Sequence, residues 1–416
     1  MAGRPPSPLR RAREASGYTQ ESFAAELGME RTSIGRWERG VQAPYPWQRQ
    51  RVAFALRVSL DELDELLRRT LRRAPSPSRD TATAPSRSGE KTGTFTLEAD
   101  VIAAAVPDLR RSLDSLDLPD DGPTRTLAEL RADVARMSED RLQARYVDLA
   151  HRLPVVLAEL GRAGQLGGQA EQRSVAALLT LALRAADGVA FKFGYLDLSA
   201  RLIDRMRTAA QRAEDHLLAA AVSYVRTETF FANGDLVTAA RALDLAVDEL
   251  PARGTPPVAS AAALAALHMR AAVVAGRAGK PDSAAEHLRE ARRACTTVPE
   301  GVYHGTAFGP ASLRIHELAV AVELSDPVGI ERASSWYPPP ELPAERRSHY
   351  FIDLARAQLD LGRHEDAHAS LQTARQVAPQ HARAHPQVRR TLTTLLSTHS
   401  APSSGLLDLA DWAGAR

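Results

Sequence analysis

The sequence predicts an all-α fold, with a small five-helix domain, a linker and a longer solenoid of helical hairpins. Residues 18–40 have the spacing of two short helices joined by a tight turn. From residue 126 onward, apolar side chains recur at helical intervals, and no convincing run alternates apolar with polar residues. That stretch also repeats a pattern of small and apolar residues after four glycines: Gly194, Gly234, Gly279 and Gly362.

Composition indicates a soluble, multidomain protein without a disulfide or a membrane span. A chain of 416 residues is too long for one core, and 44% hydrophobic with 25% charged content is typical of globular proteins. Cys295 is the only cysteine, which excludes an intrachain disulfide and fits the reducing cytoplasm. The longest apolar stretch, Val258–Gly276, is interrupted by His268 and Arg270, so we expect a buried helix there and no membrane contact.

The first predicted domain covers residues 1–73. Thr19 precedes an apolar-periodic run and is expected to cap the helix that starts at Gln20. Ser59 is the expected N-cap of a last helix that starts at Leu60. With two flanking helices, these signals give five in the domain: Leu9–Ser16, the two helices within residues 18–40, Pro46–Val58 and the helix from Leu60.

Within residues 18–40, small and apolar residues stand where two helices would pack. Ala24 lies at a close crossing, and Gly28 can take the left-handed conformation that ends the first helix. Ile34 and Trp37 are three residues apart, so both are expected to face inward. The opposite, outward face is expected to carry four polar, cationic or small residues: Arg31, Thr32, Gly35 and Arg36.

With this spacing, residues 7–67 resemble the XRE family, the helix-turn-helix fold of Cro and the lambdoid phage repressors. The resemblance implies that the second motif helix lies in the major groove of double-stranded DNA. It implies base-reading roles for Arg31, Thr32 and Arg36, and phosphate or positioning roles for Thr19, Gln20, Ser33 and Arg39. It also implies an ion pair of Arg13 with Glu38. Arginine binds guanine through O6 and N7, so we expect a half-site that contains GC pairs.

Charge distinguishes this domain from the rest of the chain. Residues 1–73 carry a net charge of +5, whereas residues 95–416 carry −4. The basic excess favours DNA as the partner, although a helical hairpin with a solvated polar face is the alternative for the motif. Between these parts, residues 74–94 are rich in Pro, Ser and Thr and nearly free of large apolar side chains, which predicts a flexible linker.

In the predicted domain of residues 95–416, the glycine repeat places small and apolar residues in one register. Five residues after the glycines come Ser199, Ala239, Ala284 and Ala367, nine after come Ile203, Leu243, Leu288 and Leu371, and twelve after come Met206, Ala246, Ala291 and Ala374. The register resembles the tetratricopeptide repeat, in which a glycine turns the chain between two antiparallel helices. Ser325–Pro327 can serve as a degenerate turn in the longest gap between glycines.

The register also predicts a concave face lined by the first helix of each pair. The residues expected there, and hence candidates for ligand binding, are Arg184, Tyr224, Glu228, Met269, His349 and Arg356. Their mixture of charge and apolar surface suits a peptide or a small amphipathic molecule. The alternative is that Tyr224 and Met269 are core and that the charges are solvated. Val302–Pro310, which groups aromatic residues with glycines, is a second candidate site or a packed loop.

His364, Glu365 and His368 match the HExxH pattern of zinc peptidases. Their position just after Gly362 places them in a turn at a surface corner, and Ala367 has a packing position in the repeat. The chain also has no phosphate-binding loop and no nucleophile motif. We therefore expect no metal, no cofactor and no catalytic residues.

These features predict a cytoplasmic, sequence-specific transcriptional regulator. Its layout resembles the peptide-sensing tetratricopeptide regulators of Gram-positive bacteria, and 50 arginines against three lysines suggest the GC-rich genome of an actinobacterium. The resemblance implies a homodimer on an inverted-repeat operator, with a peptide or small-molecule ligand in the repeats. The alternative is an interaction scaffold, in which the repeats bind a protein partner and the first domain targets it to DNA.

Overall fold

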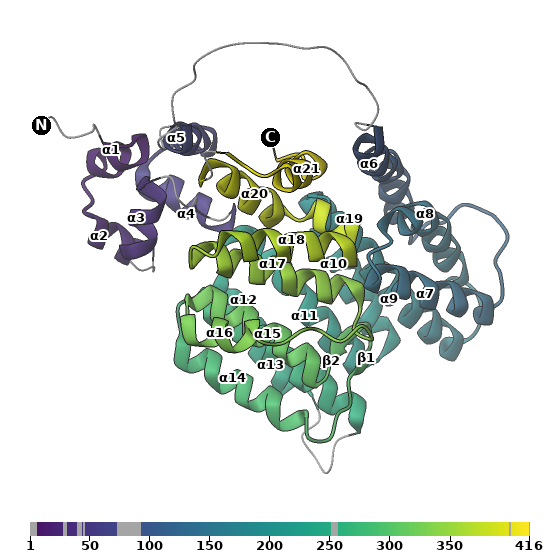
Figure 1. The fold of residues 1–416 in the computed structure, drawn as a ribbon. Coiled ribbons are helices and arrows are strands. Elements are labelled where there is room, and N and C mark those ends of the chain that lie inside the picture. The colour runs from purple at the N-terminus through teal and green to yellow at the C-terminus, as the bar shows by residue number, and fades with distance from the viewer. Residues whose placement is uncertain are drawn as a thin grey trace, which may run out of the picture. The chain divides into compact units, whose positions relative to one another are not determined.

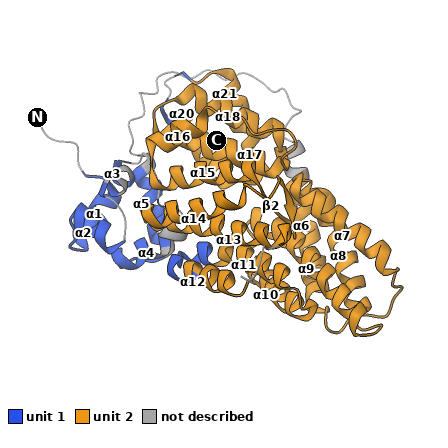
Figure 2. Cartoon of the chain, turned by 90° about the horizontal axis from the view of Figure 1, so that it is seen from below, with its two compact units in different colours: residues 1–86, 230–238, 397–401 blue, residues 87–229, 239–396, 402–416 orange. Residues whose placement is uncertain are grey.

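The computed structural model describes residues 6–27, 31–39, 44, 46–72, 93–250, 257–398 and 401–415, and it confirms the all-α prediction (Figure 1). These residues form 21 helices and one small sheet of two strands. The chain divides into two compact units (Figure 2). Unit 1 comprises Met1–Ser86, Phe230–Thr238 and Ser397–Ala401, and unit 2 comprises the remainder.

The N-terminal segment of unit 1 forms five helices: α1 (Pro8–Ala15), α2 (Gln20–Glu26), α3 (Arg31–Arg39), α4 (Pro46–Leu56) and α5 (Leu60–Arg72). Both predicted N-caps are present. Thr19 Oγ1 accepts the Ser22 amide (3.0 Å) and Ser22 Oγ accepts the Thr19 amide (2.8 Å), which makes a capping box at α2. Ser59 and Glu62 form the same pair of bonds at α5, at 3.2 and 2.8 Å.

One apolar core holds these five helices together. Ala24 on α2 and Ile34 and Trp37 on α3 are at most 3% exposed, so the small and apolar positions of the motif pack as the sequence predicts. The Leu9 amide of α1 donates to Thr70 Oγ1 of α5 (3.2 Å), which joins the first helix of the segment to the last.

Unit 2 is built mainly from helical hairpins, although the turn of the third pair, Phe230–Thr238, belongs to unit 1. It begins with α6 (Gly93–Asp114), a helix that precedes those predicted from Thr126 onward. Six pairs follow: α7 (Leu127–Leu142) and α8 (Tyr146–Ala163), α9 (Gln169–Lys192) and α10 (Leu196–Ala213), α11 (His216–Asn233) and α12 (Leu236–Asp248), α13 (Val258–Arg277) and α14 (Pro281–Ala294), α15 (Pro310–Leu324) and α16 (Pro327–Ser334), and α17 (Ala344–Asp360) and α18 (His364–Val377). Three further helices come after them: α19 (Pro379–Ala384), α20 (Pro386–Thr398) and α21 (Ser404–Ala413).

Each pair turns through one residue in the left-handed conformation. The four predicted glycines have φ between +67° and +84°, and Ala144 and Ser325 take the same role at +56° and +55°. The next amide then donates to the carbonyl five residues before it, as Tyr195 does to Ala190 (2.8 Å). The same bond closes the other five turns: Arg145 to Asp140, Asp235 to Phe230, Lys280 to Ala275, Asp326 to Ala321 and Arg363 to Gln358. The predicted glycine register and the degenerate turn at Ser325 are both confirmed.

The small residues of the register are buried on the second helix of each pair. Those at the fifth position after the glycine are at most 3% exposed: Ser199, Ala239, Ala284 and Ala367. A larger side chain there would push the two helices of a pair apart, because helix interfaces are packed to the density of a crystal.

The hairpins of unit 2 do not leave its inner surface open. Helix α7 contacts α17. The Val147 amide of α8 donates to Gln380 Oε1 of α19 (3.1 Å), and Arg141 Nη1 lies 3.7 Å from Glu345 Oε2. The first hairpin is thereby joined to the last helices, and side chains from both ends meet on the surface that the repeat register predicts to be concave.

One short segment departs from the helical prediction. Strands β1 (Gly301–Tyr303) and β2 (Thr306–Phe308) pair in an antiparallel hairpin. The two turn residues, His304 and Gly305, both have positive φ, +48° and +75°. A two-residue turn of this kind matches the twist of the strands and calls for glycine, so the His-Gly pair is the local signal for it. The expectation of helix from Thr126 to the end was wrong here.

Two helices of unit 2, α9 and α13, are long and apolar enough to cross a membrane. In their most apolar windows, 67% and 56% of the residues are buried within the fold. This burial indicates that both are core helices. Helix α13 is the stretch that the sequence predicts to be buried.

The left-handed turns can be tested by opposite substitutions at equivalent positions. Gly362 has no atom within 4 Å of the place a Cβ would take, so Gly362→Ala meets only the backbone strain and should lower the free energy of unfolding by about 1 kcal/mol. Ser325→Gly relieves that strain and should raise it by about 0.5 kcal/mol. Denaturant unfolding followed by circular dichroism measures both, and shifts of the same sign would contradict the role assigned to these turns.

Candidate DNA-binding site and buried polar cluster

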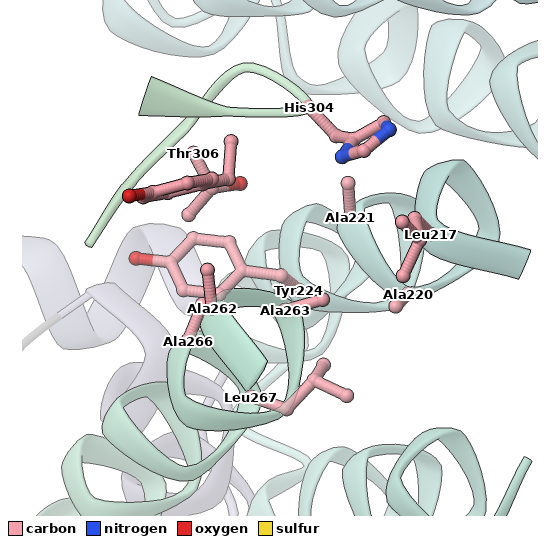
Figure 3. Close-up of a pocket in the computed structure, with 11 residues that line it drawn as sticks. Leu217, Ala220, Ala221, Tyr224, Ala262, Ala263, Ala266, Leu267, His304 and Thr306 are labelled. Atoms are coloured by element: carbon pink, nitrogen blue, oxygen red, sulfur yellow. The ribbon is translucent and has the colours of Figure 1, made fainter. Parts of the chain in front are cut away.

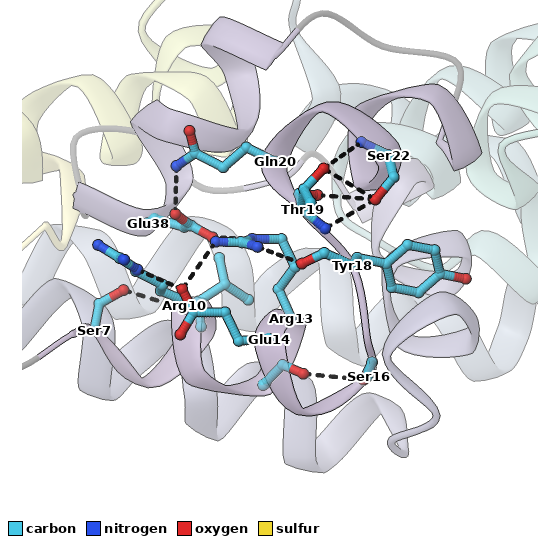
Figure 4. Close-up of polar contacts among 12 residues, drawn as sticks. Ser7, Arg10, Arg13, Glu14, Ser16, Tyr18, Thr19, Gln20, Ser22 and Glu38 are labelled. Atoms are coloured by element: carbon cyan, nitrogen blue, oxygen red, sulfur yellow. Dashed lines mark hydrogen bonds and ion pairs between the residues drawn. The ribbon is translucent and has the colours of Figure 1, made fainter.

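The helix predicted to read DNA, α3, is anchored by a buried carboxylate. Glu38 Oε1 accepts from Arg13 Nε of α1 (2.5 Å), and Glu38 Oε2 accepts from Gln20 Nε2 of α2 (2.6 Å) (Figure 4). Arg13 and Glu38 are only 4% and 6% exposed, and Arg13 Nη1 also donates to the Tyr18 carbonyl. The ion pair implied by the family resemblance is therefore present, and it joins three helices through one side chain.

Gln20, for which the resemblance implies a phosphate contact, lies at the first position of α2. Its amide nitrogen donates to Glu38 in this structure. Since that nitrogen carries two hydrogens, the bond to Glu38 uses one of them. Gln20 thus links the start of α2 to the end of α3, a role that the sequence did not predict.

Arg31, at the start of α3, forms an exposed ion pair. Its Nε lies 2.8 Å from Glu21 Oε1, and the two side chains are 65% and 61% exposed. Such surface pairs contribute about 0 to 1 kcal/mol, so Arg31 can exchange this partner for another at small cost.

Gly35 was predicted on the outward face as a position without contacts, but it is buried. A Cβ at this position would lie 3.1 Å from Nη1 of Arg39, so the glycine makes room for that side chain on α3. The backbone of Thr32, Ser33 and Arg36 belongs to α3, while their side chains, and Gly28, lie outside the described residues.

Unit 2 contains a second group of polar side chains, which we call the buried polar cluster: Arg141, Arg184, Lys192, Tyr224, Glu228, Arg270, Glu345 and Arg346. All eight lie on the first helix of a hairpin, namely α7, α9, α11, α13 or α17. Arg184 and Tyr224 are buried, and the other six are half-buried. Arg184, Tyr224 and Glu228 are among the ligand-binding candidates that the sequence predicts. The other five carry no sequence signal, because only the fold brings α7 to α17.

Two arginines of the cluster hold the β-hairpin. Arg184 Nη2 donates to Thr306 Oγ1 (2.8 Å) and Nη1 to the His304 carbonyl (3.4 Å), while Arg141 Nη2 donates to the Gly305 carbonyl (2.6 Å). Burial lowers the pKa of Arg184 to about 9, so the side chain is still a cation at neutral pH. Backbone carbonyls here solvate guanidinium groups that lie away from water.

Tyr224 lies at the centre of the cluster. Its hydroxyl accepts from Arg346 Nη2 (3.3 Å) and lies 3.4 Å from Nε2 of His316, and the Arg270 guanidinium is 4.7 Å from its ring centroid. Burial raises the pKa of Tyr224, but the guanidinium groups of Arg346 and Arg270 outweigh it and bring the pKa below its ordinary value. Two cations therefore face one phenol.

The acidic members of the cluster are fewer. Lys192 Nζ lies 3.0 Å from Glu345 Oε1, and Arg270 Nη2 lies 3.3 Å from Glu228 Oε1. Burial and the nearby Glu228 carboxylate raise the pKa of Asp187 well above its usual range, which favours the neutral acid. The eight residues of the cluster thus comprise five cations and two carboxylates, a surplus of positive charge in the interior.

A small pocket that is partly open to solvent adjoins the cluster, and its cavity volume of about 10 Å³ has room for about one water molecule (Figure 3). Its floor is apolar, with alanines and leucines of α11 and α13, and Tyr224 and the β-hairpin complete it. His304 and Thr306 line the hairpin side. Nδ1 of His304 is a buried atom without a hydrogen-bond partner in the described part of the chain. The segment Val302–Pro310, the second candidate from the sequence, thus contributes to this pocket.

The remaining candidates lie elsewhere. Met269 is 0% exposed, which fits the alternative that it is core. Arg356 Nη1 lies 3.3 Å from Glu323 Oε1. His349 lies beside His381 and His385 and does not line the pocket.

Among the described residues, one group of three side chains could hold a metal ion: His349, His381 and His385. The HExxH motif forms no such group in this part of the chain. His364 is the first residue of α18, at the turn that the sequence predicts. His368 Nε2 lies 3.1 Å from Nε2 of the Gln372 side chain.

The Glu38 anchor predicts a large effect of removing one partner. In Arg13→Met, the buried Glu38 carboxylate keeps only the Gln20 amide, and the opening free energy of α1 to α3 should fall by about 3 to 5 kcal/mol. Hydrogen–deuterium exchange of the full chain measures that local stability. The double variant Arg13→Met, Glu38→Leu should lose less than Arg13→Met alone, because it leaves no buried charge unpaired. A single variant as protected as the wild type would contradict the role of the pair.

Comparison with known proteins agrees with the geometry of unit 1. Residues 8–66 match the family model described as a helix-turn-helix domain. No curated protein and no solved structure matches the chain. Residues 8–66 accordingly form a helix-turn-helix DNA-binding domain, which indicates a DNA-binding regulator.

Proposed function

We propose that the protein is a sequence-specific transcriptional regulator whose unit 2 dimerises and senses a peptide or small-molecule ligand. The observation that carries the proposal is the helix-turn-helix domain, with α3 fixed by the buried Glu38. The net charge of +5 on residues 1–73 supports the same function, because DNA binding is driven largely by cations that neutralise phosphates.

In this proposal, Arg31, Thr32 and Arg36 read base edges from α3. The exposed pair of Arg31 with Glu21 supports it, since a weak surface pair leaves the guanidinium available for guanine. Contacts to phosphates would come from the ends of α2 and α3, from the residues Thr19, Gln20, Ser33 and Arg39. The bond between Gln20 and Glu38 would then set the position of the Gln20 amide before DNA arrives.

We further propose that a homodimer binds an inverted repeat. Two identical heads related by a two-fold axis meet two half-sites in opposite orientation, so palindromy in the operator mirrors symmetry in the protein.

The proposed ligand site is the pocket beside the buried polar cluster. Its apolar floor suits an aliphatic or aromatic group once the lining side chains move apart to admit it, and the surplus of cations nearby suits a carboxylate. A peptide C-terminus or a small organic acid combines both features. A ligand bound there would contact Tyr224 and the β-hairpin. Arg141 and Arg184 connect the β-hairpin to α7 and α9, so the ligand would also affect two first helices.

DNA recognition predicts distinct effects of single arginines. In a selection from random genomic fragments, the wild type should enrich one palindromic sequence. Arg31→Ala or Arg36→Ala should weaken binding to that sequence by about 1 to 3 kcal/mol and relax the preference at one base pair of each half-site. Arg207→Ala, an exposed arginine of α10, is the matched control and should leave binding unchanged.

Failure to enrich any palindrome would sink the regulator proposal and favour the interaction scaffold. An equal loss by Arg31→Ala on all sequences would instead make Arg31 a phosphate contact.

Sensing predicts that filling the pocket removes the bound molecule. Native mass spectrometry of the purified full chain should detect a small acid or peptide, and Ala263→Leu, which places a larger side chain in the pocket lining, should abolish that mass. Ala285→Leu makes the same change at an exposed position of α14 and should retain it. Equal loss in both variants, or a mass unchanged by Ala263→Leu, would place the ligand elsewhere.

A further inference from the structure

Three histidines of unit 2 meet at one point, away from the apolar pocket. His349 lies on α17, His381 on α19, and His385 follows α19 directly. One ring nitrogen of each lies within 4.8 Å of a ring nitrogen of both others. Ring centroids are 5.3 to 5.9 Å apart. The site draws its ligands from two segments more than 30 residues apart in sequence, so it exists only in the folded protein.

His381 is set in one tautomer by its neighbours. Ser348 Oγ donates to the Ala374 carbonyl (3.2 Å), so the same oxygen accepts from Nδ1 of His381 (3.1 Å). Nε2 therefore carries the lone pair, and Lys192 Nζ lies 3.3 Å from it. A hydrogen bond to the far nitrogen is the arrangement that orients histidine ligands in metal proteins.

His349 and His385 differ in the hydrogen bonds that metal binding would change. His349 Nε2 faces Asp353 Oδ2 at 3.5 Å, a carboxylate behind an imidazole, which leaves Nδ1 for an ion. His385 Nδ1 accepts a long bond from the Gln387 amide (3.3 Å). Binding through Nε2 of His385 exchanges that bond for a proton on Nδ1.

Charge and access also fit a metal ion. His381 is fully buried, whereas His349 and His385 are half-buried and give an ion a path from solvent. The Lys192 ammonium already occupies this place as a cation, between Nε2 of His381 and Oε1 of Glu345.

We propose that His349, His381 and His385 form a binding site for a divalent transition-metal ion of the zinc class, in competition with the ammonium of Lys192. Three imidazoles with a fourth, open position are a zinc ligand set, and nitrogen ligands select such ions over Mg²⁺ and Ca²⁺. The ion displaces Lys192 from His381 and leaves it paired with Glu345. Bound metal then pins α19 to α17, at the place where the last helices close on the first hairpin.

The test is zinc binding by the metal-stripped full chain. Isothermal titration with ZnCl₂ should give one site per chain, and Co²⁺ should give the strong visible absorption of a tetrahedral nitrogen site. His385→Gln and His349→Gln should each weaken binding by about 100-fold or more. The double variant His364→Gln, His368→Gln removes the HExxH histidines and should bind like the wild type.

Lys192→Met supplies a readout that misfolding cannot produce. Loss of the competing positive charge should tighten zinc binding by about tenfold. Four results would each overturn the proposal. They are the absence of a zinc site, unchanged zinc binding in His385→Gln, loss of zinc binding in the HExxH double variant, and weaker zinc binding in Lys192→Met.

Discussion

The left-handed turn at the end of each first helix is the constraint on which unit 2 depends. One residue with positive φ, closed by the bond from the next amide to the carbonyl five residues earlier, reverses the chain at six places. The reversal brings the small residues of the second helix against the first. All members of the buried polar cluster belong to first helices.

Partial burial of that many charges is tolerable because each has a partner from another element. Arg141 and Arg184 come from different helices and find carbonyl groups on the same two-residue turn, at Gly305 and His304. The Ala221 carbonyl of α11 is a further acceptor for Arg184, at 3.5 Å from Nη1. The short β-hairpin therefore has an electrostatic role: it solvates guanidinium groups where water is excluded. Cations paired with neutral acceptors keep their charge, and the interior remains positive.

Much of this architecture could be predicted from local sequence. The caps at Thr19 and Ser59, the packing of Trp37 and the glycine turns each depend on a few adjacent residues, and the structure has them as predicted. The β-hairpin was missed because its strands have three residues each, too few to show alternation.

The candidate site of unit 2 was harder to predict than the fold. Repeat register placed Arg184 and Tyr224 on inner faces, but Arg346 and Lys192 join them only because α17 returns to the first hairpins. The same return brings His381 near Lys192, a pair separated by 189 residues. Sequence periodicity predicts which face of a helix is buried, but it does not predict which distant helix packs against that face. Contacts of this kind are therefore known only from the tertiary structure.

The contact between the first and last hairpins also sets how unit 2 can fold. In an open repeat protein each repeat touches only its neighbours, and folding can begin anywhere and spread along the chain. Here the bond from Val147 to Gln380 spans 233 residues, and that from Arg141 to Gly305 spans 164. Such closures form late, since the entropy of a long loop must be overcome before the contact contributes. Unit 2 is therefore closed by contacts between its two ends, and loss of the final helices would destabilise the first pair.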